Sequence, residues 1–226
     1  MKEKKDEIVL GKTKAETTLD IASLVSSVVP WIGSPVSNVL SGVSFGRKIS
    51  RVREALENLA RDLRDFKSQV SEEYVKTEEF EELLEKTLRM IADERNDDKR
   101  RIFRAFLTDA IKSPGEPYDE QMRILKTLEQ LQIEHMRIIK ALNEQPQAQE
   151  ADMIFGAPIT TLTRRLPDMP SDRIEELLYR LNDLHLTNLT SLRTTMTGRG
   201  AADLRHSITP FGRKFVDFIL EEKQVS

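Results

Sequence analysis

The sequence predicts a mainly α-helical protein, in which a helical bundle is followed by a winged-helix module with a small β-wing. Apolar residues recur at three- and four-residue spacing from residue 47 to about 132, as on the buried faces of packed helices. From residue 133 onwards, two apolar helices precede a glycine-containing β-rich segment and a closing helix. We therefore expect three regions: 1–46, a polar tail and an uncharged helical hairpin; 47–132, the helical bundle; and 133–226, the winged-helix-like module.

The uncharged part of the first region is residues 21–46, IASLVSSVVPWIGSPVSNVLSGVSFG. It is long enough to span a bilayer, but its serines, glycines and prolines break it into two short helices, near 15–29 and 35–46. Two interpretations stay open. The helices are buried in the bundle or in a homo-oligomer, or they form a hairpin that enters a membrane on activation. The residues expected to act in membrane contact or assembly are Val28, Trp31, Val39 and Leu40.

The bundle begins with an apolar seam whose residues are spaced alternately by three and four. Its members are Ile49, Val52, Leu56, Leu59, Leu63, Phe66 and Val70. The seam forms either a contact inside the bundle or a homodimer interface. Further helices are expected near 77–92, 98–112 and 118–131. Thr77 is placed to cap the first of them, and Pro114 ends the second.

No catalytic or metal-binding pattern occurs in the sequence, and we expect a protein that is not an enzyme and needs no cofactor. There is no cysteine, and the histidines His135, His185 and His206 are isolated from one another. The first two fit partly buried structural positions. The cluster DERNDDKRR at 93–101 offers carboxylates to a divalent cation, but its own lysine and arginines neutralise them. This pattern favours a solvent-exposed junction between two helices, in which Asp97 or Asp98 caps the helix that begins there.

The last region is expected to follow the order of a winged helix. Its elements are a helix at 133–142, a polar loop at 143–158, a helix opening at Ser171, a β-rich segment turning on Gly198 and Gly200, a short strand at His206–Thr209 and a closing helix. The second helix, which would enter a DNA groove, carries Glu175, Glu176 and Asp183 at outward positions, and phosphates would repel them. The wing is basic instead. Its possible nucleic-acid contacts are Arg193, Arg199 and Arg205, which face a single acid, Asp203.

Four stretches together resemble the Abi-alpha type of bacterial protein, a family associated with abortive infection and phage defence. They are DDKRRIFRAFLTDAI (97–111), LEQLQIEHMRIIKAL (128–142), RIEELLYRLNDLHLTNL (173–189) and ITPFGRKFVDFIL (208–220). The resemblance covers about residues 95–220 and implies a winged-helix-like end closed by a Thr-Pro-Phe-Gly element. It implies no catalytic residues, and it does not extend to residues 1–46.

We therefore expect a non-enzymatic bacterial defence-associated protein that acts through protein–protein or membrane contacts, with the winged helix as a docking element. The alternative is a DNA-binding winged-helix transcriptional regulator that dimerises through its bundle. Expected partners are another protein or a second copy of the chain in a homo-oligomer. A membrane or a weakly bound nucleic acid is a further option. The net charge of −3 gives no global attraction to either, so such a contact must come from a local patch. The first residues lack the pattern of an export signal, which predicts a cytoplasmic location, with membrane association on activation.

Overall fold

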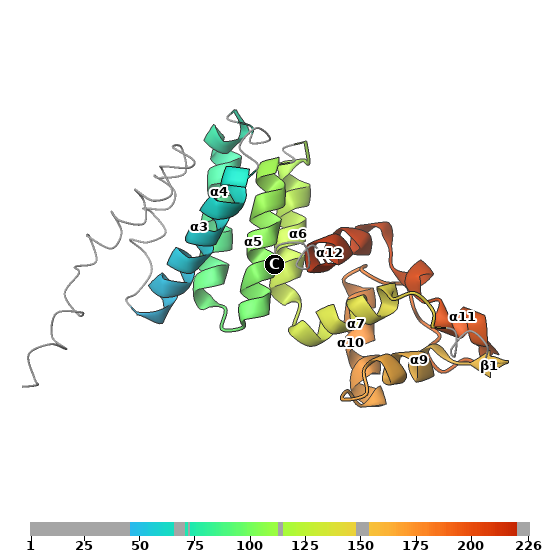
Figure 1. The fold of residues 1–226 in the computed structure, drawn as a ribbon. Helices are drawn as coiled ribbons and strands as arrows, with labels where there is room; N and C mark the ends of the chain where they lie inside the picture. The colour runs from blue at the N-terminus through green and yellow to red at the C-terminus, as the bar shows by residue number, and fades with distance from the viewer. Residues whose placement is uncertain (1–45, 66–70, 72, 113–114, 148–153, 221–226) are drawn as a thin grey trace, which may run out of the picture. The chain divides into compact units, whose positions relative to one another are not determined.

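The structure is a computed structural model that describes residues 46–65, 71, 73–112, 115–147 and 154–220, except for the side chains of residues 63–65 and 218 (Figure 1). It is mainly helical with a small two-stranded antiparallel sheet, which confirms the mainly α class. Residues 1–45, which include Val28, Trp31, Val39 and Leu40 and nearly all of the expected hairpin, lie outside the described residues. The chain forms two compact units, which we call unit 1 (Met1–Glu129) and unit 2 (Gln130–Ser226).

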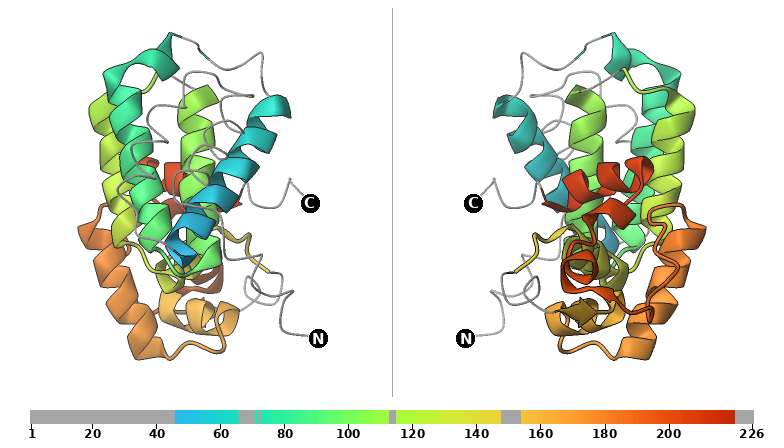
Figure 2. Two further views of the ribbon diagram at one scale, coloured as in Figure 1. Left: turned by 90° about the vertical axis from the view of Figure 1, so that its left-hand side faces the viewer. Right: turned by 90° about the vertical axis from the view of Figure 1, so that its right-hand side faces the viewer.

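Unit 1 is a set of packed helices. Its elements are α3 (Arg47–Asp65), the 3₁₀ turn η3 (Tyr74–Lys76), α4 (Glu78–Asp93), α5 (Asp97–Lys112) and α6 (Tyr118–Gln130). Helices α4, α5 and α6 run side by side, and α3 packs against α4 and α5 (Figures 1 and 2). Within unit 1, the core includes large side chains that are almost fully enclosed: Phe80, Phe103, Phe106, Leu56 and Leu83.

The apolar seam on α3 is buried inside unit 1. Ile49, Val52, Leu56 and Leu59 are at most 7% exposed. Because α3 contacts α4 and α5 of the same chain, these residues form a contact within the bundle. The side chains of Leu63, Phe66 and Val70 lie outside the described part of the chain.

Local sequence signals set the ends of the helices in unit 1. The backbone N–H of Phe80 donates to the Thr77 hydroxyl at 3.2 Å, so Thr77 caps α4 as predicted. At α5 the prediction is wrong, because Asn96 supplies the cap. The Lys99 N–H donates to Asn96 Oδ1 at 3.0 Å, whereas Asp97 and Asp98 are already helical. A capping side chain must precede the first helical turn to reach its amides, and Asn96 occupies that position.

Unit 2 contains more helix than the sequence predicts. Its elements are α7 (Ile133–Asn143), β1 (Phe155–Gly156), α9 (Pro158–Arg165), α10 (Ser171–Asp183), β2 (Met196–Thr197), α11 (Gly198–Ala202), the 3₁₀ turn η4 (Arg205–Ser207) and α12 (Pro210–Leu220). Strand β1 pairs with β2, Phe155 opposite Thr197 and Gly156 opposite Met196. The predicted polar loop therefore contains β1. Helix α9, which begins at Pro158, was not predicted from the sequence.

Two predictions about the β-rich segment are wrong. Gly198 and Gly200 belong to the short helix α11 and not to a turn, because the Thr197 hydroxyl caps that helix by accepting from the Gly200 N–H at 3.2 Å. The predicted strand at His206–Thr209 is replaced by η4 and a single antiparallel bridge between Thr187 and Ile208.

The start of α12 depends on a glycine. The Gly212 N–H donates to the Thr209 hydroxyl at 2.9 Å, which satisfies one of the first amides of the helix. A Cβ atom on Gly212 would lie 2.0 Å from the Leu186 carbonyl oxygen, so only glycine lets α12 approach the chain that follows α10 this closely.

A buried arginine joins three segments of unit 2. The Arg165 side chain is 1% exposed, and its guanidinium donates to the carbonyl oxygens of Ala141 at 2.6 Å and Ala202 at 2.9 Å. The cation of α9 therefore lies at the C-terminal ends of α7 and α11, where helix dipoles favour positive charge. Among the described residues, no helix is both long and apolar enough to cross a membrane.

Candidate functional site

Helix α10 presents an acidic surface opposite its buried side. Its buried residues follow helical spacing and are Ile174, Leu177, Leu178 and Leu181. The outward positions hold four carboxylates, one tyrosine and one arginine, Arg180. We call the carboxylates and the tyrosine the acidic face: Asp172, Glu175, Glu176, Tyr179 and Asp183. Tyr179 is 53% exposed, the third highest value among the large hydrophobic side chains that the structure describes.

Glu175 is the most connected residue of the acidic face. One carboxylate oxygen accepts from Arg193 at 2.8 Å and 3.1 Å, and the other accepts from the Tyr179 hydroxyl at 3.1 Å. These hydrogen bonds, with the one from Arg193 first, lower the pKa of Glu175 below its ordinary value. Arg193 also contacts Asp172 at 3.1 Å. The segment that follows α10 thus folds back and neutralises part of the acidic face.

The arginines on α10 itself are bound within unit 2. Arg173 forms ion pairs with Glu134 on α7 and with Glu176 at 2.8 Å. The hydrogen bond from Arg173 lowers the pKa of Glu134. Arg180 donates to the side-chain oxygen of Gln130 at 2.6 Å. The guanidinium groups of α10 therefore hold the helix to its neighbours, and carboxylates outnumber the one exposed arginine, Arg180, on its outward side.

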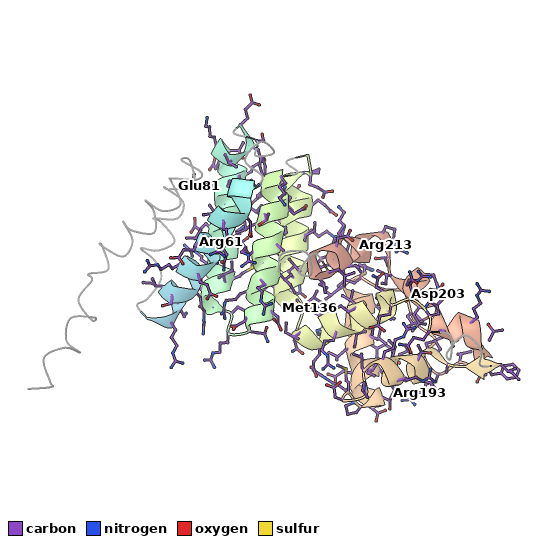
Figure 3. All side chains as sticks on the ribbon, in the orientation of Figure 1. Arg61, Glu81, Met136, Arg193, Asp203 and Arg213 are labelled. Atoms are coloured by element: carbon purple, nitrogen blue, oxygen red, sulfur yellow. The ribbon has the colours of Figure 1, made fainter. Side chains whose placement is uncertain are left out.

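The three arginines predicted as a basic wing do not gather around Asp203. Arg205 binds Asp203 with two hydrogen bonds, of 2.9 Å and 3.0 Å. Arg193 binds α10 instead, and Figure 3 shows that Arg193 and Asp203 are well separated. Arg199 is exposed at the start of α11 and forms no ion pair with the described side chains. Folding thus directs Arg193 and Arg205 to different carboxylates, which sequence proximity cannot reveal.

The histidines occupy two kinds of position. His135 is 4% exposed, and its Nδ1 accepts from the Gln132 N–H at 3.0 Å, as expected for a structural residue. His185 is exposed, contrary to prediction, because it forms the left-handed turn that ends α10, with φ of 57°. His206 is also exposed. In the described part of the chain, no group of three or more His, Asp or Glu side chains is arranged to hold a metal ion.

Two exposed features of unit 2 escaped the sequence analysis. Tyr179 lies between the core positions of α10, and that spacing could have identified it as outward-facing. Ile154 and Phe155 are 80% and 66% exposed, at and just before β1. The signal for this pair was a run of three large apolar residues, Met153 to Phe155, after a polar stretch of the loop.

The acidic face offers carboxylate acceptors and an aromatic ring on a rigid helix. Carboxylates bind guanidinium and ammonium groups through charge-assisted hydrogen bonds, and tyrosine contributes apolar contact with a polar end. This combination suits the recognition of a basic protein surface. Comparison of the chain with protein-family models, with curated proteins and with solved structures finds no match.

Proposed function

We propose that unit 2 is a winged-helix module. The pairwise packing of α7, α9 and α10 supports a three-helix core of this type. Strand β1 lies between α7 and α9 in the sequence and pairs with β2, which follows α10. The bridge between Thr187 and Ile208 brings together the two ends of the segment that would be the wing.

We propose further that this module docks a protein partner with a basic surface, and that the chain acts without catalysing a reaction. The acidic face of α10 carries the proposal. In a DNA-binding winged helix, the corresponding helix would pass between phosphates that repel Asp172, Glu176 and Asp183. The ion pairs of Arg193 with Asp172 and Glu175 also occupy a guanidinium that DNA binding would need.

The resemblance to Abi-alpha proteins adds a biological setting to the proposal. We propose that the chain belongs to a bacterial defence response, in which unit 2 supplies docking and residues 21–46 supply self-assembly or membrane contact. The two parts then have separate tasks, and each can be tested without the other.

The docking proposal is tested by reversing one charge on the acidic face. Glu176→Lys places a cation at an exposed position of α10, and Asp217→Lys makes the same charge change at an exposed position of α12. Proteins captured from the host by photo-cross-linking would be compared for wild type and both variants. Binding to duplex DNA would be measured on the same samples by fluorescence anisotropy over a range of salt concentrations.

Docking and DNA binding predict opposite results for Glu176→Lys. If the module docks a basic protein, this variant loses the cross-linked partner and Asp217→Lys keeps it. If the module binds DNA, Glu176→Lys strengthens binding, because it removes a repulsive charge, and neutralising Arg193, Arg199 and Arg205 together weakens it. Tight binding to one DNA sequence that survives the triple change would contradict both charge arguments.

A further inference from the structure

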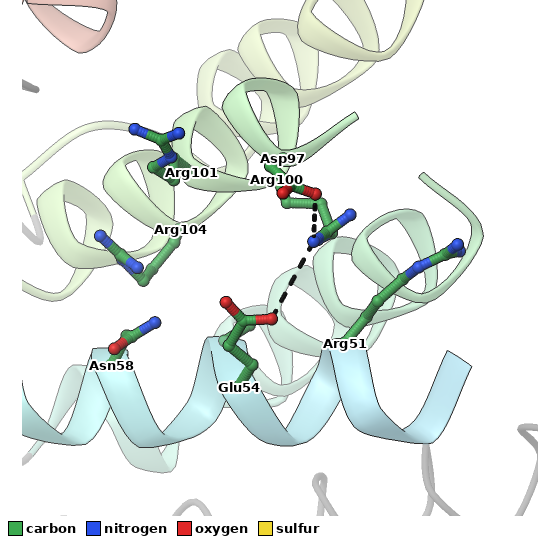
Figure 4. A pocket seen from close by; sticks show the side chains of 8 residues that line it. Arg51, Glu54, Asn58, Asp97, Arg100, Arg101 and Arg104 are labelled. Atoms are coloured by element: carbon green, nitrogen blue, oxygen red, sulfur yellow. Dashed lines mark ion pairs between the residues drawn. The ribbon is translucent and has the colours of Figure 1, made fainter. Parts of the chain in front are cut away.

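A cleft of about 180 Å³ lies between α3 and α5 in unit 1 (Figure 4). Four of the side chains that line it are arginines: Arg51, Arg100, Arg101 and Arg104. Two carboxylates, Glu54 and Asp97, also border the cleft, so its lining has a net charge of +2. The whole chain has a net charge of −3, so positive charge is enriched among these lining residues. Two carboxylates outside the lining pair with it: Asp98 contacts Arg101 at 2.6 Å, and Asp62 contacts Arg104 at 3.3 Å.

Neighbouring groups hold the guanidinium groups of α5 in place. The Arg100 side chain is 14% exposed and is fixed by Asp97 at 2.5 Å and by the Arg95 carbonyl oxygen at 3.1 Å. Arg104 contacts Asp62 at 3.3 Å. Side chains that are already ordered lose little conformational entropy when an anion binds, so such an arrangement favours binding.

The positive charge is only partly compensated within the cleft. Arg51 donates at 2.9 Å to the carbonyl oxygen of Ala92, which is a neutral acceptor. The contact of Glu54 with Arg100 is 3.9 Å long, and the Glu54 side chain is 65% exposed. Glu54 can therefore turn into solvent and leave Arg100 to an anion that binds it better, while Asp97 still holds that arginine at 2.5 Å.

We infer that this cleft binds the phosphate group of a phosphorylated ligand. The planar guanidinium fork matches phosphate oxygens with paired hydrogen bonds, and four such groups line this cleft. A space of this size corresponds to about six water molecules, which suits one phosphate or diphosphate group. The remainder of the ligand lies outside the cleft. Glu54 competes with the phosphate for Arg100, and its charge limits the affinity.

The test is calorimetric titration of the full chain with inorganic pyrophosphate at low ionic strength. Arg101→Gln lowers the affinity about tenfold, because it removes a charge-assisted contact. Arg53→Gln is the matched control, since Arg53 and Arg101 are 48% and 50% exposed and each pairs with an exposed carboxylate of its own helix. Arg53 is not among the residues that line the cleft, and its loss changes the affinity by less than about twofold because long-range attraction is screened.

Glu54→Gln gives the opposite effect and does not depend on the loss of an arginine. It removes the competing charge at an exposed position, so pyrophosphate binds more tightly. Weaker binding by Glu54→Gln, or equal losses for Arg101→Gln and Arg53→Gln, would overturn the inference.

Vesicles distinguish a soluble ligand from a lipid headgroup. Phosphatidylcholine vesicles are compared with and without phosphatidic acid, which presents a phosphate monoester. Binding to pyrophosphate alone assigns the cleft to a soluble phosphorylated ligand, and binding to phosphatidic acid that requires Arg101 assigns it to a lipid. If the folded chain binds neither pyrophosphate nor these vesicles, the inference is wrong.

Discussion

The Thr209 hydroxyl donates a 2.6 Å hydrogen bond to the backbone carbonyl oxygen of His185. The same hydroxyl accepts from the Gly212 N–H at 2.9 Å. One side chain therefore caps α12 and fastens it to the turn that ends α10. The Thr-Pro-Phe-Gly element of the sequence therefore connects two helices through the Thr209 side chain.

Gly212→Ala is expected to lower the free energy of unfolding by about 3 kcal/mol, because the new Cβ would press on a backbone oxygen that cannot move without α10 or α12. Urea denaturation followed by circular dichroism measures the loss. Gly115→Ala is the matched control, since a Cβ there meets no atom within 4 Å. Equal stability of the two variants would mean that α12 does not approach Leu186 closely.

His185→Gly is expected to stabilise the protein by about 0.5–1 kcal/mol, because glycine adopts a φ of +57° without the strain that a side chain causes. The His185 N–H donates to Asn182 and the Leu186 N–H to Leu181, both at 2.9 Å, as in a helix end that favours glycine. His185→Ala keeps the strained conformation and should bring no gain. A gain from alanine equal to that from glycine would contradict this account.

Because of His135, the free energy of unfolding is expected to be smaller in mild acid than at neutral pH. Burial lowers its pKa below the usual 6.5, and the nearby Arg173 lowers it further. Between the folded and unfolded pKa values, the unfolded chain binds a proton that the folded chain does not, so stability falls as the pH drops below about 6.5. Denaturation curves at pH 7.5 and 5.5 measure this loss.

His135→Gln separates that titration from the hydrogen bond. Glutamine at this position still offers an acceptor to the Gln132 N–H but does not titrate. The variant should therefore lose less stability than wild type between the two pH values. The same loss in both proteins would mean that other groups cause it.

Leu59→Ala should cost about 2–5 kcal/mol of unfolding free energy, because Leu59 is 2% exposed in the seam of α3. Arg53→Ala, at an exposed position of the same helix, should change stability by about 0.5 kcal/mol or less. A loss of about half a kcal/mol or less for Leu59→Ala would contradict its place in the core.

The uncharged segment 21–46 can be tested although it lies outside the described residues. Val28→Asp or Val39→Asp is expected to abolish liposome association or self-assembly, because a charge on an apolar face opposes both. Liposome flotation and light scattering measure the effect, and circular dichroism checks folding. Unfolding of both variants would identify the segment as ordinary core, and full activity of both in cells would show that it is dispensable.

Helices could be predicted from the sequence where periodicity and a cap agreed. The spacing of Phe80, Leu84 and Leu88 with Thr77 in front defines α4 to within one residue at each end, because all of these signals are local. α9 was missed because its eight residues, with Pro158 first, are too few for a clear period. The segment at Gly198 and Gly200 was misread, since glycine suggests a turn while the cap from Thr197 and the burial of Ala201 favour a helix.

The residues of the acidic face could be predicted from the sequence, but their ion-pair partners could not. Its composition follows from helical spacing, so the outward carboxylates of α10 were identified correctly. The partner of Arg193 was not, because residues 18 and 21 positions apart meet only when the segment after α10 folds back. The arginine cleft was missed for the same reason, since Arg51 comes from one helix and the others come from a helix more than forty residues later.

The enclosed guanidinium of Arg165 has a consequence for how this module can change in evolution. Ala202, which accepts one of its hydrogen bonds, is the buried last residue of α11, in the connection between β2 and α12. Connections between elements ordinarily tolerate deletion where they are exposed. A shortened segment would leave a buried donor without that acceptor, which is costly. We therefore expect Arg165 and the segment around Ala202 to be lost or retained together, and a fragment of unit 2 that folds alone must contain both.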